Sequence, residues 1–200
     1  MNPLYDLPRK AIFLDKDGTL IPDLPYNVNP ELITLENETI EGLKLFRDEN
    51  FLLVVISNQG GIAKGYFKEE ALENVWNKIS ALLQSHQLSI DAFYYCPHLP
   101  EADIEDYAVA CDCRKPMPGL ILQAARDLRI DLAQSWMIGD ILNDVEAGNR
   151  AGCASILINN GNETEWLINP LRKPVFTAGN LLEAAAFIKL QISKQVEYEE

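Results

Sequence analysis

The chain has 200 residues, 48% of them hydrophobic, and a formal net charge of −13 at pH 7. This composition is ordinary for a globular protein, and the length suits one domain with a full core. The negative charge argues against nucleic acid and anionic membrane as partners, because both require basic surface.

Residues 1–10 contain no apolar stretch of signal-peptide length, and the longest strongly apolar run, residues 51–56, is too short to span a bilayer. We therefore expect a cytoplasmic protein, and we also expect it to be a monomer. A reducing compartment favours thiols or metal ligands over disulfides for the four cysteines.

Short apolar runs alternate with helical patterns along the chain. The apolar runs predict strands at residues 10–14, 51–56, 92–95, 135–138, 154–158 and 175–177. Amphipathic spacing predicts one helix capped by Asn37 and another with Pro118 in its first turn. Further helices are predicted at residues 72–83, 144–151 and 181–192, followed by a frayed acidic tail at 195–200.

Strands that alternate with helices predict an α/β fold, with a mainly parallel sheet in a Rossmann-like three-layer α/β/α arrangement. We see no sequence for a large cap domain and treat residues 1–200 as a single domain. Ligands bind such sheets beyond the carboxyl ends of the strands. Three predicted strands end at Asp15, at Ser57 and Asn58, and at Asp140, so we expect these residues to converge.

The segment Asp15-Lys16-Asp17-Gly18-Thr19 directly follows the first predicted strand. Two carboxylates two residues apart suit a nucleophile and a general acid that reach one substrate. Asp and Gly also favour ordinary turns, but polar residues at a strand end favour a functional role.

Companion residues at the later strand ends extend this pattern: Ser57, Lys115, and Gly139-Asp140 with Asp144. In this order they resemble the motifs of the haloacid dehalogenase (HAD) superfamily of phosphotransferases. The segments IFLDKDGTL, SNQGGIAKGYF, YYCPH and CDCRKPMPG are similar to those of the bacterial D-glycero-D-manno-heptose bisphosphate phosphatases and the related histidinol-phosphate phosphatases. The resemblance extends from about residue 11 to residue 161.

The resemblance implies a phosphatase that works through an aspartyl-phosphate. Asp15 is the implied nucleophile and Asp17 the general acid and base, while Ser57 and Lys115 bind the phosphoryl oxygens. Several carboxylates would repel an anionic phosphate unless a cation lay between them. Mg²⁺ prefers such ligands, and we assign it the side chains of Asp15 and Asp140 and the backbone carbonyl of Asp17.

The same resemblance places substrate contacts in two short segments and one arginine. These contacts are Asp23, Tyr26, Ser57, Asn58, Gln59, Arg114 and Lys115. Arg114 would read a distal phosphate or carboxylate, because its guanidinium fork fits either group. Ile141 departs from the heptose group, which commonly has Lys directly after the Gly-Asp pair, so one positive charge is missing there. Asp144 is either an orienting neighbour of Lys115 and the metal or a charge in the first turn of a helix.

Three cysteines and one histidine lie close together in the loop at residues 96–113. They are Cys96, His98, Cys111 and Cys113, a set that satisfies a closed four-coordinate structural zinc site. The resembling group carries zinc at the matching positions. The zinc would order the loop and hold the following Arg114 and Lys115 over the phosphate site. The alternative is a loop of free thiols.

The leading hypothesis is a phosphatase for a small phosphorylated metabolite, with a heptose 1,7-bisphosphate losing its 7-phosphate as first choice and histidinol phosphate or another sugar phosphate as second. A hypothesis from another class is a phospho-acceptor signalling domain, in which phosphorylated Asp15 is the message. Asp17 argues against this, because an acceptor needs no acid two residues further on. A zinc-ordered interaction protein with an inactive site is a third reading.

Overall fold

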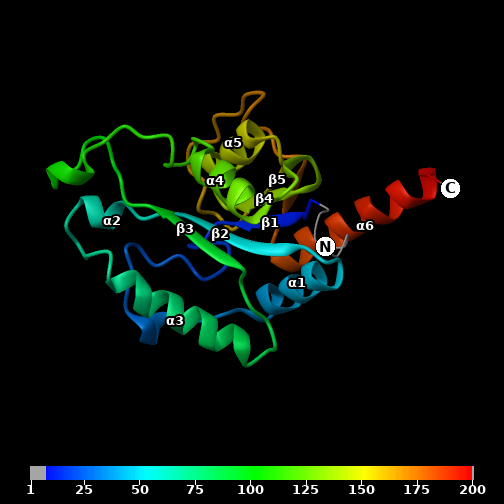
Figure 1. Ribbon diagram of the computed structural model, residues 1–200, viewed down its shortest axis with the longest axis horizontal. Helices are drawn as coiled ribbons and strands as arrows, with labels where there is room; N and C mark the ends of the chain where they lie inside the picture. Colours follow the sequence, from blue (N-terminus) through cyan, green and yellow to red (C-terminus); the bar gives the residue numbers. More distant parts are fainter. Residues whose placement is uncertain (1–7, 200) are drawn as a thin grey trace, which may run out of the picture.

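A computed structural model describes residues 8–199 of the chain, and its centre is one parallel sheet of six strands (Figure 1). The spatial order of the strands is β3-β2-β1-β4-β5-β6. The strands are β1 (Ala11–Leu14), β2 (Leu52–Asn58), β3 (Ala92–Cys96), β4 (Trp136–Gly139), β5 (Ala154–Ile158) and β6 (Phe176–Ala178). Every pairing is parallel, which confirms the predicted α/β class.

Helices cover both faces of the sheet (Figure 1). On one face lie α1 (Asn37–Asp48), α3 (Ala71–Gln84) and α6 (Leu181–Glu199), and on the other lie α4 (Gly119–Leu128) and α5 (Leu142–Ala151). A four-residue helix, α2 (Gly60–Ala63), follows β2. Short 3-10 helices are η2 (Pro30–Leu32), η3 (Glu105–Tyr107) and η4 (Leu132–Gln134). The predicted three-layer arrangement is therefore confirmed.

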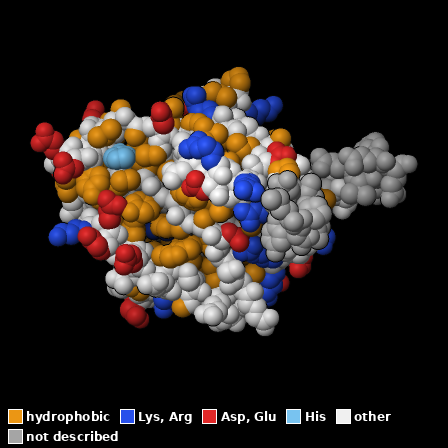
Figure 2. Space-filling model, in the orientation of Figure 1, with side chains coloured by type: hydrophobic (Ala, Val, Ile, Leu, Met, Phe, Trp, Pro, Cys, Tyr) orange, Lys and Arg blue, Asp and Glu red, His pale blue; other side chains and the backbone are white. Residues whose placement is uncertain are grey.

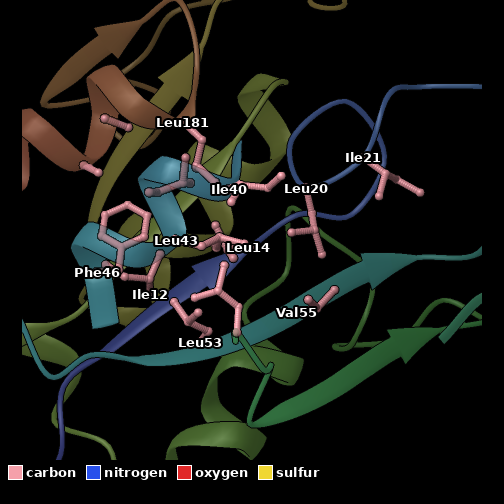
Figure 3. Packing of buried hydrophobic residues seen from close by; sticks show 14 of the residues in the cluster. Ile12, Leu14, Leu20, Ile21, Ile40, Leu43, Phe46, Leu53, Val55 and Leu181 are labelled. Atoms are coloured by element: carbon pink, nitrogen blue, oxygen red, sulfur yellow. The ribbon is translucent and has the colours of Figure 1, made fainter. Parts of the chain in front are cut away.

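The two helical layers each bury one side of the central strands. Successive side chains of a strand point to opposite faces, so Ile12 and Leu14 of β1 join the cluster beneath α1, α3 and α6. Ala11 and Phe13 join the cluster beneath α4. Figure 3 shows the first cluster, in which Leu43 and Phe46 of α1 pack over the strands. Burial on both faces explains why the strands are continuously apolar.

The helix starts and ends differ from the predictions in four places. Glu36, rather than Asn37, is the N-cap of α1, and Pro118 is the N-cap of α4 rather than a residue of its first turn. Helix α5 begins at Leu142, two residues before the predicted start. The predicted frayed tail is wrong, because α6 continues to Glu199. The segment contains no Gly or Pro to end the helix, and its Lys, Gln and Glu residues favour helix. Glu200 lies outside the described residues.

Strand β2 also runs two residues beyond the predicted end at residue 56, so Ser57 and Asn58 belong to the strand itself. Both pair in register with β3, opposite Tyr95 and Cys96. This extension brings the two polar residues to the carboxyl edge of the sheet.

Among the residues that the structure describes, none of the helices combines the length and the apolar character needed to cross a bilayer.

The close approach of α1 to α6 gives a test of the helical layer. A Cβ added to Gly42 of α1 would lie 2.8 Å from the backbone oxygen of Leu181. Replacing Gly by Ala within a helix normally stabilises it by up to about 1 kcal/mol. Here we expect Gly42→Ala to lower the free energy of unfolding by about 1–3 kcal/mol, because the backbone of α6 must move.

Urea unfolding followed by circular dichroism measures this change. The control is Glu41→Ala, one residue away on the exposed side of α1, which should change stability by less than about 0.5 kcal/mol. A Gly42→Ala variant more stable than the parent protein would show that the two helices do not meet as described.

Candidate active site

Three carboxylates meet at the carboxyl edge of the sheet. Asp15 directly follows β1, Asp140 directly follows the neighbouring β4, and Asp144 lies in the first turn of α5. An oxygen from each lies within 4.8 Å of the others, and all three residues are buried. The predicted convergence of Asp15 and Asp140 is therefore observed, with Asp144 as a third member.

Lys115 is the cation of this cluster and is only 3% exposed. Its Nζ pairs with Asp15 Oδ1, lies 2.6 Å from Asp144 Oδ1 and donates to the backbone oxygen of Ile56 at 2.9 Å. Burial alone would lower the pKa of Lys115, but the Asp144 and Asp15 carboxylates outweigh it and raise the pKa above the usual value. The two carboxylates therefore favour the charged form of the lysine. Asp144 lies both beside this lysine and in the first turn of α5, so its position agrees with each of the two sequence alternatives.

The backbone of Lys115 is tied to strand β2. Lys115 N–H donates to Asn58 Oδ1 at 3.0 Å, and Asn58 Nδ2 donates back to the Lys115 carbonyl at 3.1 Å. This paired contact explains why Asn58 at a strand end matters to the site. It holds the lysine in place across a long sequence separation.

Asp17 has different partners from the other carboxylates. Its Oδ1 lies 3.0 Å from the buried Lys16 ammonium, and its Oδ2 accepts from Gln59 Nε2 at 3.4 Å. Burial raises the pKa of Asp17 to about 6, although Lys16 opposes the rise. A carboxyl with such a pKa can hold and release a proton near neutral pH, as a general acid and base must.

Asp140 has the most perturbed carboxylate pKa for which a value is resolved. Burial first, and then the charges of Asp15 and Asp144, raise its pKa to about 7. Asn162 Nδ2 donates to Asp140 Oδ2 at 2.7 Å and partly offsets the rise. The pKa of Asp144 is raised to about 6, again first by burial. Such crowding favours either a shared proton or a bound cation.

The turn after β1 comes unusually close to Asp140. Gly18 has φ +85°, and a Cβ at this position would lie 2.0 Å from Asp140 Oδ2. Only glycine fits both the conformation and the contact. Asn160 Nδ2 also holds the Gly18 carbonyl at 2.7 Å. The backbone of residues 17–18 is thus pressed against the carboxylate cluster.

A cavity of about 320 Å³ opens above these groups. It is lined by Asp15, Asp17, Asp23, Pro25, Tyr26, Asn58, Gln59, Gly60, Gly61, Lys115, Asp140, Ile141 and Asn162. Most predicted site residues are among them. Ser57 and Arg114 are not: Ser57 is 1% exposed beneath Gln59, whose Nε2 lies 2.7 Å from its Oγ. Arg114 faces Gly60 and donates to the His98 carbonyl at 3.1 Å.

Sequence reasoning missed Asn162 and the partnership of Lys16 with Asp17. Asn162 follows β5 by a few residues within a polar run, Asn159-Asn160-Gly161-Asn162. The position of this run after a strand was the available signal, because β5 ends at the same sheet edge. Lys16 carried no signal, since burial of a lysine cannot be read from one sequence.

The predicted zinc ligands also converge. Cys96, His98, Cys111 and Cys113 each place a ligand atom within 4.8 Å of the others. Cys113 Sγ lies 2.8 Å from Cys96 Sγ, 3.1 Å from Cys111 Sγ and 3.2 Å from His98 Nδ1. The thiols are unbonded to one another. Cys153 lies elsewhere, buried in the apolar core as predicted.

A family model described as HAD-hydrolase-like matches residues 112–184. The D-glycero-beta-D-manno-heptose-1,7-bisphosphate 7-phosphatase of Escherichia coli K12 is 36% identical over 170 residues, which cover 80% of this chain and 89% of the relative. The enzyme of the same name from Haemophilus ducreyi is 41% identical over 155 residues, covering 76% and 85%.

Two solved structures share the fold over nearly their whole length. A HAD-like phosphatase from Mesorhizobium loti matches with a TM-score of 0.78 and 30% identity, covering 91% of this chain and 88% of that one. The D,D-heptose 1,7-bisphosphate phosphatase of B. bronchiseptica, solved with magnesium and phosphate, matches with a TM-score of 0.74 and 27% identity, covering 91% and 99%.

The parallel sheet, and the carboxylates and lysine at its carboxyl edge, define a phosphotransferase fold of the HAD class. Together with the identities above, they show that the chain belongs to the haloacid dehalogenase superfamily, in the group of the heptose 1,7-bisphosphate phosphatases.

The raised pKa of Asp140 makes a prediction about stability. The pKa rises from about 4 in the unfolded chain to about 7 in the folded one, so the folded state binds the extra proton between these values. The free energy of unfolding should therefore fall as the pH rises through this range in Mg²⁺-free buffer.

Urea unfolding at about pH 5 and about pH 8 measures the fall. Asp140→Asn should reduce it, whereas Glu41→Gln, an exposed control on α1, should keep it unchanged. An Asp140→Asn variant with the full pH dependence would contradict the assignment.

Proposed function

We propose that the protein is a Mg²⁺-dependent phosphatase that removes the 7-phosphate from D-glycero-D-manno-heptose 1,7-bisphosphate. The observation that carries the proposal is the contact of Asp15 with Lys115 at the floor of a polar cavity, with Asp17 lining the same cavity. The relatives named for this activity cover most of the chain and support the choice of substrate.

The carboxylate cluster fits a hard divalent cation. Asp15 and Asp140 bring two buried carboxylates together, and Gly18, the residue after Asp17, lies directly against Asp140. These groups, with the Asp17 carbonyl, are the ones that would hold Mg²⁺. When bound, the cation offsets the repulsion between the carboxylates and an anionic phosphate. The related enzyme solved with magnesium and phosphate supports this assignment.

Each step of the reaction has a residue in the cavity. An oxygen of Asp15 attacks phosphorus, forming an aspartyl-phosphate as the bond to the sugar oxygen breaks. Asp17 gives its proton to the leaving oxygen, then takes one from the water that hydrolyses the intermediate and releases phosphate. The raised pKa of Asp17, about 6, suits both transfers.

Lys115 binds the phosphoryl oxygens as their charge spreads in the transition state. We assign a second contact to Ser57, whose Oγ sits directly beneath the cavity-lining Gln59. Asp144 positions Lys115 through their ion pair at 2.6 Å. Asp23, Tyr26, Asn58 and Gln59 line the same cavity and would contact the sugar, while Arg114 would reach the distal phosphate from beside Gly60.

Histidinol phosphate remains the second candidate substrate for one specific reason. Ile141 lines the cavity and brings no charge for a second phosphate. A substrate with one phosphate needs less positive charge there.

We further infer one domain and a monomer. The described strands all belong to one sheet, and the loop at residues 96–113 joins that sheet through β3 and α4, which supports a single domain.

The nucleophile assignment has a direct test. With Mg²⁺ present, the protein should release phosphate repeatedly from the heptose bisphosphate and much more slowly from histidinol phosphate. Asp15→Asn should abolish release, because the amide oxygen is a poor nucleophile, and Asp17→Asn should slow it by roughly 10²–10⁴-fold. A colorimetric phosphate assay gives the rates.

Asp106→Asn, in the exposed η3 segment, is the control and should keep the parental rate. Full hydrolysis by Asp15→Asn would contradict the assigned nucleophile. A single long-lived phosphorylation of Asp15 without turnover would instead favour the phospho-acceptor hypothesis.

We also propose that Cys96, His98, Cys111 and Cys113 hold a structural zinc. Three thiols and an imidazole within 4.8 Å of one another match its preferred donor set, and four protein ligands leave no open position for catalysis. Because Arg114 and Lys115 directly follow Cys113, the zinc would order the loop that presents them.

Elemental analysis of the purified protein should give about one zinc per chain. Cys113→Ser should lose most of the metal and lower the thermal midpoint, because the loop has little apolar core of its own. Cys153→Ser is the matched control, since this cysteine lies outside the cluster, and it should keep the zinc. Equal zinc loss in both variants would contradict the site.

A further inference from the structure

The proposed substrate carries two phosphates, and the second must meet positive charge within a strongly acidic protein. Lys115 and Lys16 are unavailable, because both are buried and each is already paired with carboxylates of the site. Ile141 adds no charge. Arg114 already donates a hydrogen bond from one guanidinium nitrogen to the His98 carbonyl. A further cation at the cavity rim would satisfy this need.

Lys64 does not line the cavity itself, but it contacts Tyr26, which does, and it is held there by aromatic rings. Its Nζ donates to the Tyr26 hydroxyl at 2.6 Å, and it lies 4.9 Å from the centre of the Tyr26 ring and 5.9 Å from that of Tyr66. The two rings pack edge to face, with centroids 4.9 Å apart. Cation–π attraction favours this arrangement. Because Tyr26 lines the cavity, its contact places the ammonium beside the substrate space.

The local backbone is built to bring Tyr26 to this position. Tyr26 has φ 56°, a left-handed conformation that is uncommon for an aromatic residue. Gly61 of α2, three residues before Lys64, leaves the space: a Cβ there would lie 3.1 Å from Tyr26 Cδ1 and 2.4 Å from Phe67 Cε1. Gly61 and the left-handed backbone at Tyr26 together fix the position of the Tyr26 ring, and this ring in turn positions the Lys64 ammonium.

Lys64 keeps its charge and two of its three donors for a ligand. The hydrogen bond with Tyr26 raises the pKa of Lys64, so the ammonium stays protonated. An ammonium has three donors, and the Tyr26 hydroxyl accepts from one of them. Among the carboxylates whose side chains the structure describes, none forms an ion pair with Lys64; Asp103 acts on it only through its field.

The charges around Lys64 make its positive charge important for binding an anion. Acidic side chains gather at the end of the molecule that carries α2 and η3, at the left of Figure 2, whereas Lys and Arg gather nearer the base of α6. Asp23 also lines the cavity. An anionic substrate that approaches this face therefore depends on local attraction.

We propose that Lys64, held by Tyr26, binds the distal phosphate of a sugar bisphosphate together with Arg114 and so strengthens the preference for bisphosphate over monophosphate. This inference rests on the proposed function, because it names the specificity contact of that same site. Lys64 supplies at the rim the positive charge that Ile141 does not.

Steady-state kinetics with two substrates test the proposal. The probes are D-glycero-D-manno-heptose 1,7-bisphosphate and the heptose 7-phosphate, which lacks the distal group. Lys64→Met should lower kcat/KM for the bisphosphate about tenfold or more, mainly through KM, because a hydrogen bond to a charged group is lost. The rate with the monophosphate should stay the same, and Lys64→Arg should restore the preference.

Lys68→Met is the matched control, an exposed lysine four residues further on that does not line the catalytic cavity. It should leave both rates unchanged. Tyr26→Phe removes only the hydroxyl partner and should weaken the preference by a smaller factor than Lys64→Met. The bisphosphate preference should also fall with added salt, since an exposed charge is screened.

Three outcomes would overturn the inference. An equal fall of both rates in Lys64→Met would assign Lys64 a purely structural role. An unchanged preference in Lys64→Met would show that Lys64 does not touch the distal phosphate, and an equal loss in Lys68→Met would reduce the effect to surface charge. In each case the parental protein still hydrolyses substrate. A parental protein inactive toward both substrates would instead contradict the proposed function.

Discussion

One buried lysine makes the carboxyl edge of this sheet possible. Lys115 sits between Asp15 and Asp144, with Asp140 close by, in a place where unpaired charge is costly. Its single positive charge is shared by two of the three crowded carboxylates, and the third, Asp140, has a pKa of about 7. The remaining excess of negative charge would favour a bound divalent cation. Removing the lysine would leave the cluster uncompensated.

The position of that lysine depends on parts of the chain far from the catalytic carboxylates. Asn58 at the end of β2 clamps its backbone from one side. The thiol and imidazole cluster lies immediately before it in the sequence, ending at Cys113. A well-ordered loop at residues 96–113 therefore also positions Lys115 in the active site. A structural metal there would serve catalysis without touching the substrate.

The second theme is how an acidic protein receives an anionic substrate. Its net charge of −13 repels phosphate at long range, so attraction must be local. Lys115 supplies it at the floor of the cavity, while Arg114 and Lys64 lie around the short helix α2. The two glycines of this helix leave room for these residues. A side chain at Gly61 would collide with Phe67, and one at Gly60 would crowd Arg114. The sugar-facing part of the site is thus assembled around residues without side chains.

The sequence by itself determined the order of strands and helices and the residues at the strand ends. Burial of a strand or helix leaves a pattern of apolar residues within a few positions of the sequence. For this reason β1, β4 and β5, and the positions of Asp15 and Asp140 after them, could be predicted. Only the tertiary structure decided the partners. The pairing of Asp144 with Lys115, the approach of Asn162 to Asp140 and the placement of Lys64 on Tyr26 join residues distant in the chain. These pairings could not be predicted for a geometric reason. Parallel strands bring separate loops to one edge of the sheet, and local sequence patterns do not show which side chains meet there.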